Sequence, residues 1–200
     1  MPRKLRPEVP GDFFHIFTRG NKRTTLFRDN RDYEAWLQML ERTVDNFAWR
    51  CHAYCAMPNH FHLLIETPAP TRSSGMRHLK GSYAQRFNVR YDGSGYVFDG
   101  RYGANAVEGD PQFLETCRYI VLNPVRAGLR DAPEAWRWSS YCGTAGLTRA
   151  PSFLTLDLVL GILGGSVAQA QHRYRRFVAD GLVQGPGPET MSGIKHASRA

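Results

Sequence analysis

The sequence predicts an α+β fold, and three observations lead to this prediction. Strand-like and helix-like segments follow one another in the order β-α-β-β-α-β, and further helices come after them. A short turn joins the second and third strands, which makes them a hairpin. At 200 residues the chain is long enough to bury a core without disulfides. The order is that of a ferredoxin-like split βαβ sheet with a C-terminal helical extension.

The first strand is predicted from its residue types, and the first helix from the spacing of its apolar residues. Phe13–Thr18 is rich in aromatic and β-branched residues and predicts a strand. Arg19–Arg23 follows as a basic turn. Asp29–Asp32 supplies capping side chains for a helix, whose apolar residues recur at three and four positions as far as Phe47. One face of this helix is therefore expected to be buried.

The next segments predict a hairpin and a second helix. Trp49–Ala56 and His60–Ile65 are expected strands, joined by a turn at Met57–Asn59. A helix is expected from Arg72 to Arg90, with an apolar stripe along one side and basic residues on the rest.

The second half of the chain predicts short strands and several helices. Short strands are expected at 96–98 and 104–107. A helix with Asp110 as its N-cap is expected to run to about Leu122, where Asn123-Pro124 interrupts it. Shorter helices are expected near 132–136 and 155–163 and at 167–179, and the Gly-, Pro- and Ser-rich segment from 184 is an expected flexible tail.

The composition indicates a soluble globular protein with a polyanionic partner. Apolar residues make up 42% and charged residues 22%, which excludes disordered, collagen-like and disulfide-rich miniprotein classes. The 26 basic and 18 acidic residues give a net charge of +8, and 22 of the basic residues are arginine. Arginine suits phosphate and base edges better than lipid headgroups, so nucleic acid is favoured over an anionic membrane.

The ends of the chain and the cysteines predict a reduced, cytoplasmic protein. No apolar run of signal-peptide length follows the basic N-terminus, and the longest apolar stretch, near 154–163, is too short and polar to span a bilayer. Cys51 and Cys55 lack a second close pair that would complete a zinc-finger spacing. The cysteines are therefore expected to be buried thiols.

Two histidines stand on one predicted strand. Because strand side chains alternate, His60 and His62 share a face while Phe61 points to the other. Two adjacent imidazoles are half of a divalent-metal site, although two ordinary, partly buried histidines give the same pattern. Glu66 lies on the same strand face and is a possible accessory ligand.

A tyrosine and an asparagine stand four residues apart on the next helix. Tyr119 and Asn123 therefore share a helix face, where a tyrosine nucleophile and an oxygen ligand would be neighbours. The alternative is structural: Tyr119 packs in the core, and Asn123-Pro124 is an ordinary helix stop.

Taken together, these stretches resemble one family. Met57–Leu64 looks like the His-hydrophobic-His motif of single-tyrosine HUH transposases. Tyr119–Leu129 closely resembles the signature of their REP-associated tyrosine transposase branch. Three further segments match in the family's order: Thr18–Asn21, Phe98–Tyr102 and Trp138–Tyr141.

The resemblance implies a domain organisation and an activity. Residues 10–145 would form the catalytic domain, 146–183 a helical extension and 184–200 a flexible tail. The family cleaves and rejoins single-stranded DNA at hairpins in repetitive extragenic palindromes (REP) through a 5′-phosphotyrosine intermediate. Tyr119 would be the nucleophile, and His60, His62 and Asn123 would hold Mg²⁺ or Mn²⁺. Two imidazoles favour softer ions than Mg²⁺.

The expected partner is single-stranded DNA with hairpins, and the protein is expected to be a monomer, with a dimer as the alternative. Tyr102 is the candidate for base stacking. The candidate phosphate contacts are Arg19, Lys22, Arg23, Arg77, Lys80, Arg86, Arg101 and Arg126.

Two other functions remain open from the sequence. A non-catalytic module that binds structured nucleic acid would share the charge and the fold. A metallo-hydrolase would use the two histidines with a water nucleophile and form no covalent protein–DNA species.

Overall fold

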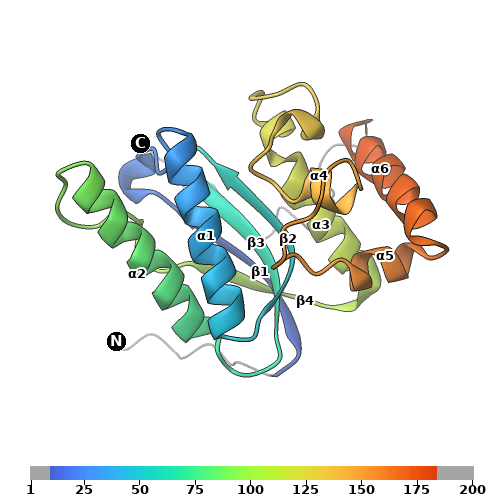
Figure 1. The fold of residues 1–200 in the computed structure, drawn as a ribbon, viewed down its shortest axis with the longest axis horizontal. Helices are drawn as coiled ribbons and strands as arrows, with labels where there is room; N and C mark the ends of the chain where they lie inside the picture. Colours follow the sequence, from blue (N-terminus) through green and yellow to red (C-terminus); the bar gives the residue numbers. More distant parts are fainter. Residues whose placement is uncertain (1–9, 184–200) are drawn as a thin grey trace, which may run out of the picture.

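The computed structural model describes residues 10–183, which build a four-stranded antiparallel sheet with helices on both faces (Figure 1). The elements in chain order are β1 (Asp12–Arg19), the 3-10 turn η1 (Asn21–Arg23), α1 (Asn30–Asn46), β2 (Arg50–Met57), β3 (His60–Thr67), α2 (Arg72–Arg90), β4 (Gly103–Val107), α3 (Gly109–Arg126), the 3-10 turn η2 (Pro133–Ala135), α4 (Tyr141–Thr144), α5 (Asp157–Leu163) and α6 (Val167–Val183). The predicted tail at 184–200 lies outside the described residues.

The strand order is β2-β3-β1-β4, which is the ferredoxin-like order that the sequence predicts. The second and third strands form a hairpin through Pro58 and Asn59, and the helices after β4 form the C-terminal extension. The predicted fold class is therefore confirmed.

The two faces of the sheet are covered by different helices. In Figure 1, α1 and α2 lie on one side of the sheet and α3 with α6 on the other. Trp36 of α1 packs against Phe61 of β3 with ring centroids 4.9 Å apart, whereas Phe113 of α3 packs against Phe13 of β1 at 5.3 Å. Because both faces are covered, the residues from Phe61 to Ile65 are all buried.

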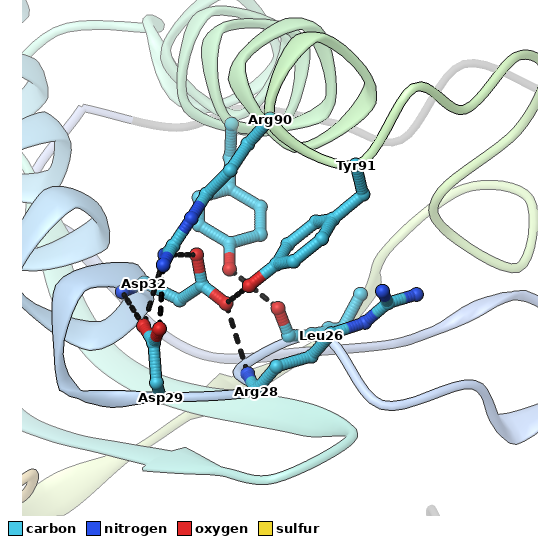
Figure 2. Close-up of polar contacts among 7 residues, drawn as sticks. Leu26, Arg28, Asp29, Asp32, Arg90 and Tyr91 are labelled. Atoms are coloured by element: carbon cyan, nitrogen blue, oxygen red, sulfur yellow. Dashed lines mark hydrogen bonds and ion pairs between the residues drawn. The ribbon is translucent and has the colours of Figure 1, made fainter.

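A charged cluster joins the start of α1 to the end of α2 (Figure 2). Asp29 caps α1 by accepting a hydrogen bond from the Asp32 backbone N–H, as its sequence predicts. The buried Asp32 carboxylate also accepts from Arg90, from the Tyr91 hydroxyl and from the Arg28 backbone N–H. These bonds satisfy the buried charge and fix the two helices to each other on this face.

The segment at 96–98 is not a strand, which corrects one prediction. Its backbone makes only isolated contacts beside the end of β1: Asn21 N–H donates to the Val97 carbonyl, and Asp99 N–H donates to the Arg19 carbonyl. Two bonds do not make a ladder, so the segment is a loop fastened to the end of the sheet. The predicted strand at 104–107 is β4.

Helix α3 also differs from its prediction at both ends. It begins at Gly109, whose φ of 70° is a left-handed conformation that glycine adopts without strain, and its N-cap is Glu108 rather than Asp110. It continues through Pro124 to Arg126 instead of ending near Leu122. The segment at 132–136 forms only the turn η2, and α6 extends four residues beyond the predicted end at 179.

The expectation of buried thiols holds for three of the four cysteines. All four are free, and Cys51, Cys55 and Cys117 are buried, whereas Cys142 is only partly buried. None of the helices within residues 10–183 has the length and apolarity needed to span a bilayer.

Candidate active site

The two histidines of β3 lie on the face of the sheet that α3 covers. Phe61, between them in sequence, points to the opposite face and packs on α1, as strand alternation predicts. The His60 and His62 rings have centroids 5.1 Å apart at an angle of 87°. Strand period alone therefore brings both imidazoles to one site.

Helix α3 places Tyr119 against this pair. The Tyr119 ring lies edge-on to His62, with centroids 5.6 Å apart and an interplanar angle of 90°. Neighbouring residues of the same helix, such as Phe113 and Ile120, are buried, whereas Tyr119 is half-buried at the edge of the packed face. The apolar side of α3 thus packs in the core, while the Tyr119 side chain stays partly exposed to solvent.

Asn123 explains how α3 passes through Pro124. Proline has no N–H to donate to the carbonyl of residue 120, four positions earlier. The Asn123 side-chain Nδ2 donates instead to the Tyr119 carbonyl at 2.8 Å and to the Ile120 carbonyl at 3.4 Å. This fixes the direction of the Asn123 side chain and leaves its Oδ1 as the atom available to a ligand.

A third histidine, His15 of β1, contacts the predicted site residues. Its Nε2 is 3.0 Å from His62 Nδ1, the two rings are stacked, and its ring also meets the Tyr119 ring edge-on at 5.6 Å. His60 Nδ1 is likewise engaged, 2.7 Å from Asn59 Oδ1. Both predicted metal ligands therefore have Nδ1 occupied and Nε2 available.

Burial keeps these imidazoles neutral. It lowers the pKa of His15 to about 4 and that of His60 to about 4, with a further contribution from the Arg19 charge at His60. The pKa of His62 is also well below its usual value, mainly through burial and then through the neighbouring histidines. Neutral imidazole is the form that coordinates a metal ion.

Burial acts in the opposite direction on the tyrosine. It raises the pKa of Tyr119, while the Arg126 guanidinium, the Asn123 side chain and Arg19 act to lower it. Arg126 lies 5.7 Å from the Tyr119 ring centroid. The phenol is therefore protonated at neutral pH and surrounded by groups that stabilise its anion.

His60, His62, Tyr119 and Asn123 line one cleft of about 540 Å³, and His15 and Asn59 lie behind the two histidines, outside its lining. Its polar lining comprises the residues predicted as catalytic or metal-binding, three of the predicted phosphate contacts, a threonine and one acidic residue: Tyr119, His60, His62, Asn123, Arg19, Arg101, Arg126, Thr18 and Asp99. Segments far apart in the sequence thus meet at the end of the sheet.

The other predicted DNA contacts do not line this cleft. Two are exposed in η1, three lie on α2, and one precedes β4: Lys22, Arg23, Arg77, Lys80, Arg86 and Tyr102. Their contact with DNA stays a prediction.

Lys80 has a structural role in this fold. Its Nζ donates to the Gly100 carbonyl at 2.8 Å and lies 5.0 Å from the Phe98 ring centroid, and burial lowers its pKa to about 8. Lys80 therefore fastens the loop that presents Asp99 and Arg101 to the cleft.

The donor atoms fit a divalent ion only if the substrate or water completes the coordination. Among residues 10–183, no three His, Cys, Asp or Glu side chains form a group able to hold a metal. Glu66, considered above as an accessory ligand, pairs with Arg50 at 2.8 Å and does not line the cleft. The protein donors are two imidazole nitrogens and the Asn123 amide oxygen.

The sequence did not reveal His15, Asn59 or Asp99 as site residues. His15 lies in an apolar strand 47 positions from His62, and only the pairing of β1 with β3 brings them together. For Asn59, the one feature in the sequence that could have indicated its contact with His60 is its position next to His60 in the turn between the two strands.

Known proteins with similar sequences show the family of the chain. The family model described as IS200-like transposase matches residues 12–123, more than half of the chain. A curated relative from Haemophilus influenzae, provisionally named REP-associated tyrosine transposase, is 25% identical over 113 residues, which cover 50% of this chain and 64% of the relative. The chain therefore spans just under two thirds of that relative's length.

One solved structure shows the shared fold. A structure of a REP-associated tyrosine transposase bound to a REP hairpin superposes with a TM-score of 0.61 and 18% identity, over 84% of this chain and 93% of that chain. A provisionally assigned transposase from Deinococcus radiodurans reaches a TM-score of only 0.42 at 18% identity, over 67% of this chain and 97% of that chain. The chain belongs to the IS200-like transposase family, and within it resembles the REP-associated tyrosine transposases.

Proposed function

We propose that this protein is a divalent-metal-dependent transposase that nicks and rejoins single-stranded DNA at hairpin-bearing REP sequences. The observation that supports this most is the presence of Tyr119, His60 and His62 in one basic cleft. A tyrosine beside two imidazoles is an arrangement that suits phosphoryl transfer through a covalent intermediate.

In the proposed step, Tyr119 Oη attacks the phosphorus of the scissile phosphodiester. A tyrosine–phosphorus ester bond forms, the bond from phosphorus to the 3′ oxygen breaks, and that oxygen leaves as a 3′-OH after taking up a proton. The phenol proton is released to solvent. The product is a 5′-phosphotyrosyl link, and attack by the 3′-OH of another strand reverses the step without ATP.

The cleft residues assist this step through charge and position. Tyr119 must lose its proton, and the Arg126 and Arg19 charges favour the resulting anion. Arg126 Nη2 donates to the Gly181 carbonyl at 3.3 Å, while its Nη1 is buried with no hydrogen-bond partner among residues 10–183. The positive charge of Arg126 would attract a phosphate of the substrate in the cleft.

His60 Nε2, His62 Nε2 and Asn123 Oδ1 would hold the divalent ion, Mg²⁺ or Mn²⁺. When bound, the ion neutralises negative charge that builds on a non-bridging phosphate oxygen. The histidines are held in place by contacts on their Nδ1 atoms, so they are oriented before substrate arrives.

The proposed partner is single-stranded DNA that contains a hairpin, and the solved REP-associated tyrosine transposase with the same fold is bound to a REP hairpin. Residues 10–145 would form the catalytic domain and residues 146–183 a helical extension. Because one chain supplies the tyrosine and both histidines, the cleft does not need a second subunit, which supports a monomer.

A cleavage assay tests this function. Single-stranded oligonucleotides carrying hairpins from the repeats around the gene are incubated with protein and Mn²⁺ or Mg²⁺. Wild-type protein is expected to give a protease-sensitive covalent protein–DNA species on a denaturing gel. Tyr119→Phe removes the nucleophile and should lower cleavage by more than about 1,000-fold.

Tyr96→Phe is the matched control, because Tyr96 is 89% exposed and lies outside the cleft. It should cleave like the wild type. Cleavage by Tyr119→Phe at the wild-type rate would contradict the nucleophile. Hairpin binding without any cleavage would support the non-catalytic alternative, and cleavage without a covalent species would support a water nucleophile.

A further inference from the structure

His15 Nε2 lies 3.0 Å from Nδ1 of the predicted metal ligand His62. We infer that His15 is a positioning residue that holds the proton of His62 on Nδ1, so that His62 presents its Nε2 lone pair to the cleft. The inference rests on the proposed function, in which His62 is a metal ligand.

The position of His15 follows from the register of the sheet. In the pairing of β1 with β3, Phe17 lies opposite His62 and His15 lies opposite Leu64. His15 is therefore a diagonal neighbour of His62 on the same face, within reach of a long side chain. Both side chains are buried, 9% and 5% exposed, and their rings are stacked with centroids 5.2 Å apart.

The hydrogen bond between the two rings can have its proton on either side. If His62 Nδ1 donates to His15 Nε2, the Nε2 lone pair of His62 is free for a metal ion. If His15 Nε2 donates instead, the His62 proton lies on Nε2 and blocks coordination. The 3.0 Å separation fits both arrangements, so the choice of tautomer determines whether the site works.

His60 does not have this ambiguity. Its Nδ1 faces Asn59 Oδ1, an amide oxygen that only accepts, and the other end of that amide donates to the Arg23 carbonyl at 3.5 Å. The His60 proton is therefore fixed on Nδ1. If His15 acts as the acceptor for His62, both ligands adopt the same tautomer and present Nε2.

Nitrogen NMR of metal-free wild-type protein tests the inference without any variant. With ¹⁵N-labelled histidine, the expected spectrum shows His62 protonated at Nδ1 and bare at Nε2. A His62 proton on Nε2 would overturn the inference. His15→Phe, which offers no acceptor, is expected to shift His62 toward the Nε2–H tautomer.

Mn²⁺ titration by calorimetry supplies a second readout. Loss of a partner of a metal-ligating histidine weakens metal affinity by about 10- to 100-fold, which is the loss expected for His15→Phe. His15→Gln keeps an acceptor where Nε2 stood and should stay within about threefold of the wild type. His52→Phe is the control, since it also removes a buried strand histidine, but one that contacts Phe13, Phe113 and Glu66.

The outcomes separate this inference from the proposed function. Wild-type affinity in His15→Phe would overturn the inference alone, provided that His60→Ala still abolishes Mn²⁺ binding. Absence of Mn²⁺ binding by the wild type would contradict the proposed metal site. The His62 tautomer measured by NMR in the wild type would still decide whether His15 holds the His62 proton on Nδ1. If His15→Phe does not fold, the wild-type spectrum and His15→Gln remain decisive.

Discussion

At the scale of single residues, Asn123 has two separable roles. Its Nδ2 satisfies the Ile120 carbonyl that Pro124 leaves without a donor, and its Oδ1 is the proposed metal ligand. Asn123→Ala should lower the free energy of unfolding by about 1–2 kcal/mol, because a helix carbonyl loses its partner, and should also weaken Mn²⁺ binding. Urea denaturation and calorimetry measure the two effects.

The variant Pro124→Ala separates these roles. An alanine N–H at position 124 can bond the Ile120 carbonyl, so Asn123→Ala should cost less stability in the Pro124→Ala background. The loss of Mn²⁺ affinity should be the same in both backgrounds. An equal stability cost in both backgrounds would show that Asn123 does not compensate for the proline.

The buried side chain of His52 should make the stability of the protein depend on pH. This fully buried imidazole has a lowered pKa, because burial outweighs the attraction of the Glu66 carboxylate 3.6 Å away. The groups around it are the Phe13 and Phe113 rings, the Glu66 carboxylate, the Arg50 guanidinium and the Thr155 backbone.

The sign of the effect follows from proton binding. Below the ordinary pKa of 6.5 the unfolded chain protonates His52 while the folded chain keeps it neutral, so stability falls as pH falls. His52→Phe should reduce this slope between pH 6.5 and 5 by at most about 1.4 kcal/mol per pH unit. Urea denaturation of both proteins at several pH values measures it, and parallel curves would contradict the prediction.

At the scale of elements, α2 offers a matched pair of glycines. A Cβ on Gly75 would lie 2.2 Å from the buried Trp49 ring, whereas a Cβ on Gly81 would meet nothing within 4 Å. Gly81→Ala should stabilise the protein by about 0.5–1 kcal/mol through helix propensity. Gly75→Ala should destabilise it by about 1–3 kcal/mol through overpacking. Thermal or urea denaturation that gives both changes the same sign would contradict this packing.

Elements with a clear period could be predicted from the sequence, and those set by tertiary contacts could not. The Asp29 cap and the apolar stripe that follows it predict α1, and alternation around Phe61 predicts β3. The segment at 96–98 has strand-forming residues but finds only two backbone bonds. Pro124 does not end α3, because the Asn123 side chain replaces the missing donor.

The same distinction applies to the site. Strand and helix periods act over short stretches of chain, so the sequence could predict that His60 and His62 share a strand face. The roles of these histidines and of Tyr119 stay predictions. The contact of His15 with His62 could not be predicted, since it depends on the register in which β1 pairs with β3. Lys80 is predicted to contact DNA because it is a basic residue on α2. The sequence could not predict that its ammonium group donates a hydrogen bond to the Gly100 carbonyl.

At the scale of the whole molecule, helix α6, which lies outside the family match at 12–123, packs against α3 and holds two of its arginines. Backbone carbonyls of α6 accept from two arginines of α3: Phe177 from Arg118 and Gly181 from Arg126, each at 3.3 Å. The second of these orients a cleft residue. Helix α6 thus fixes one guanidinium nitrogen of Arg126, a residue that lines the cleft.

The central claim is that the side chain of Tyr119 forms a covalent bond with DNA. The most direct measurement is mass spectrometry of the trapped protein–hairpin species after nuclease and trypsin digestion. We expect a nucleotide adduct on the peptide that contains Tyr119, attached through its phenolic oxygen and dependent on Mn²⁺ or Mg²⁺. An adduct on another residue, or cleaved DNA with no adduct on the protein, would contradict the account.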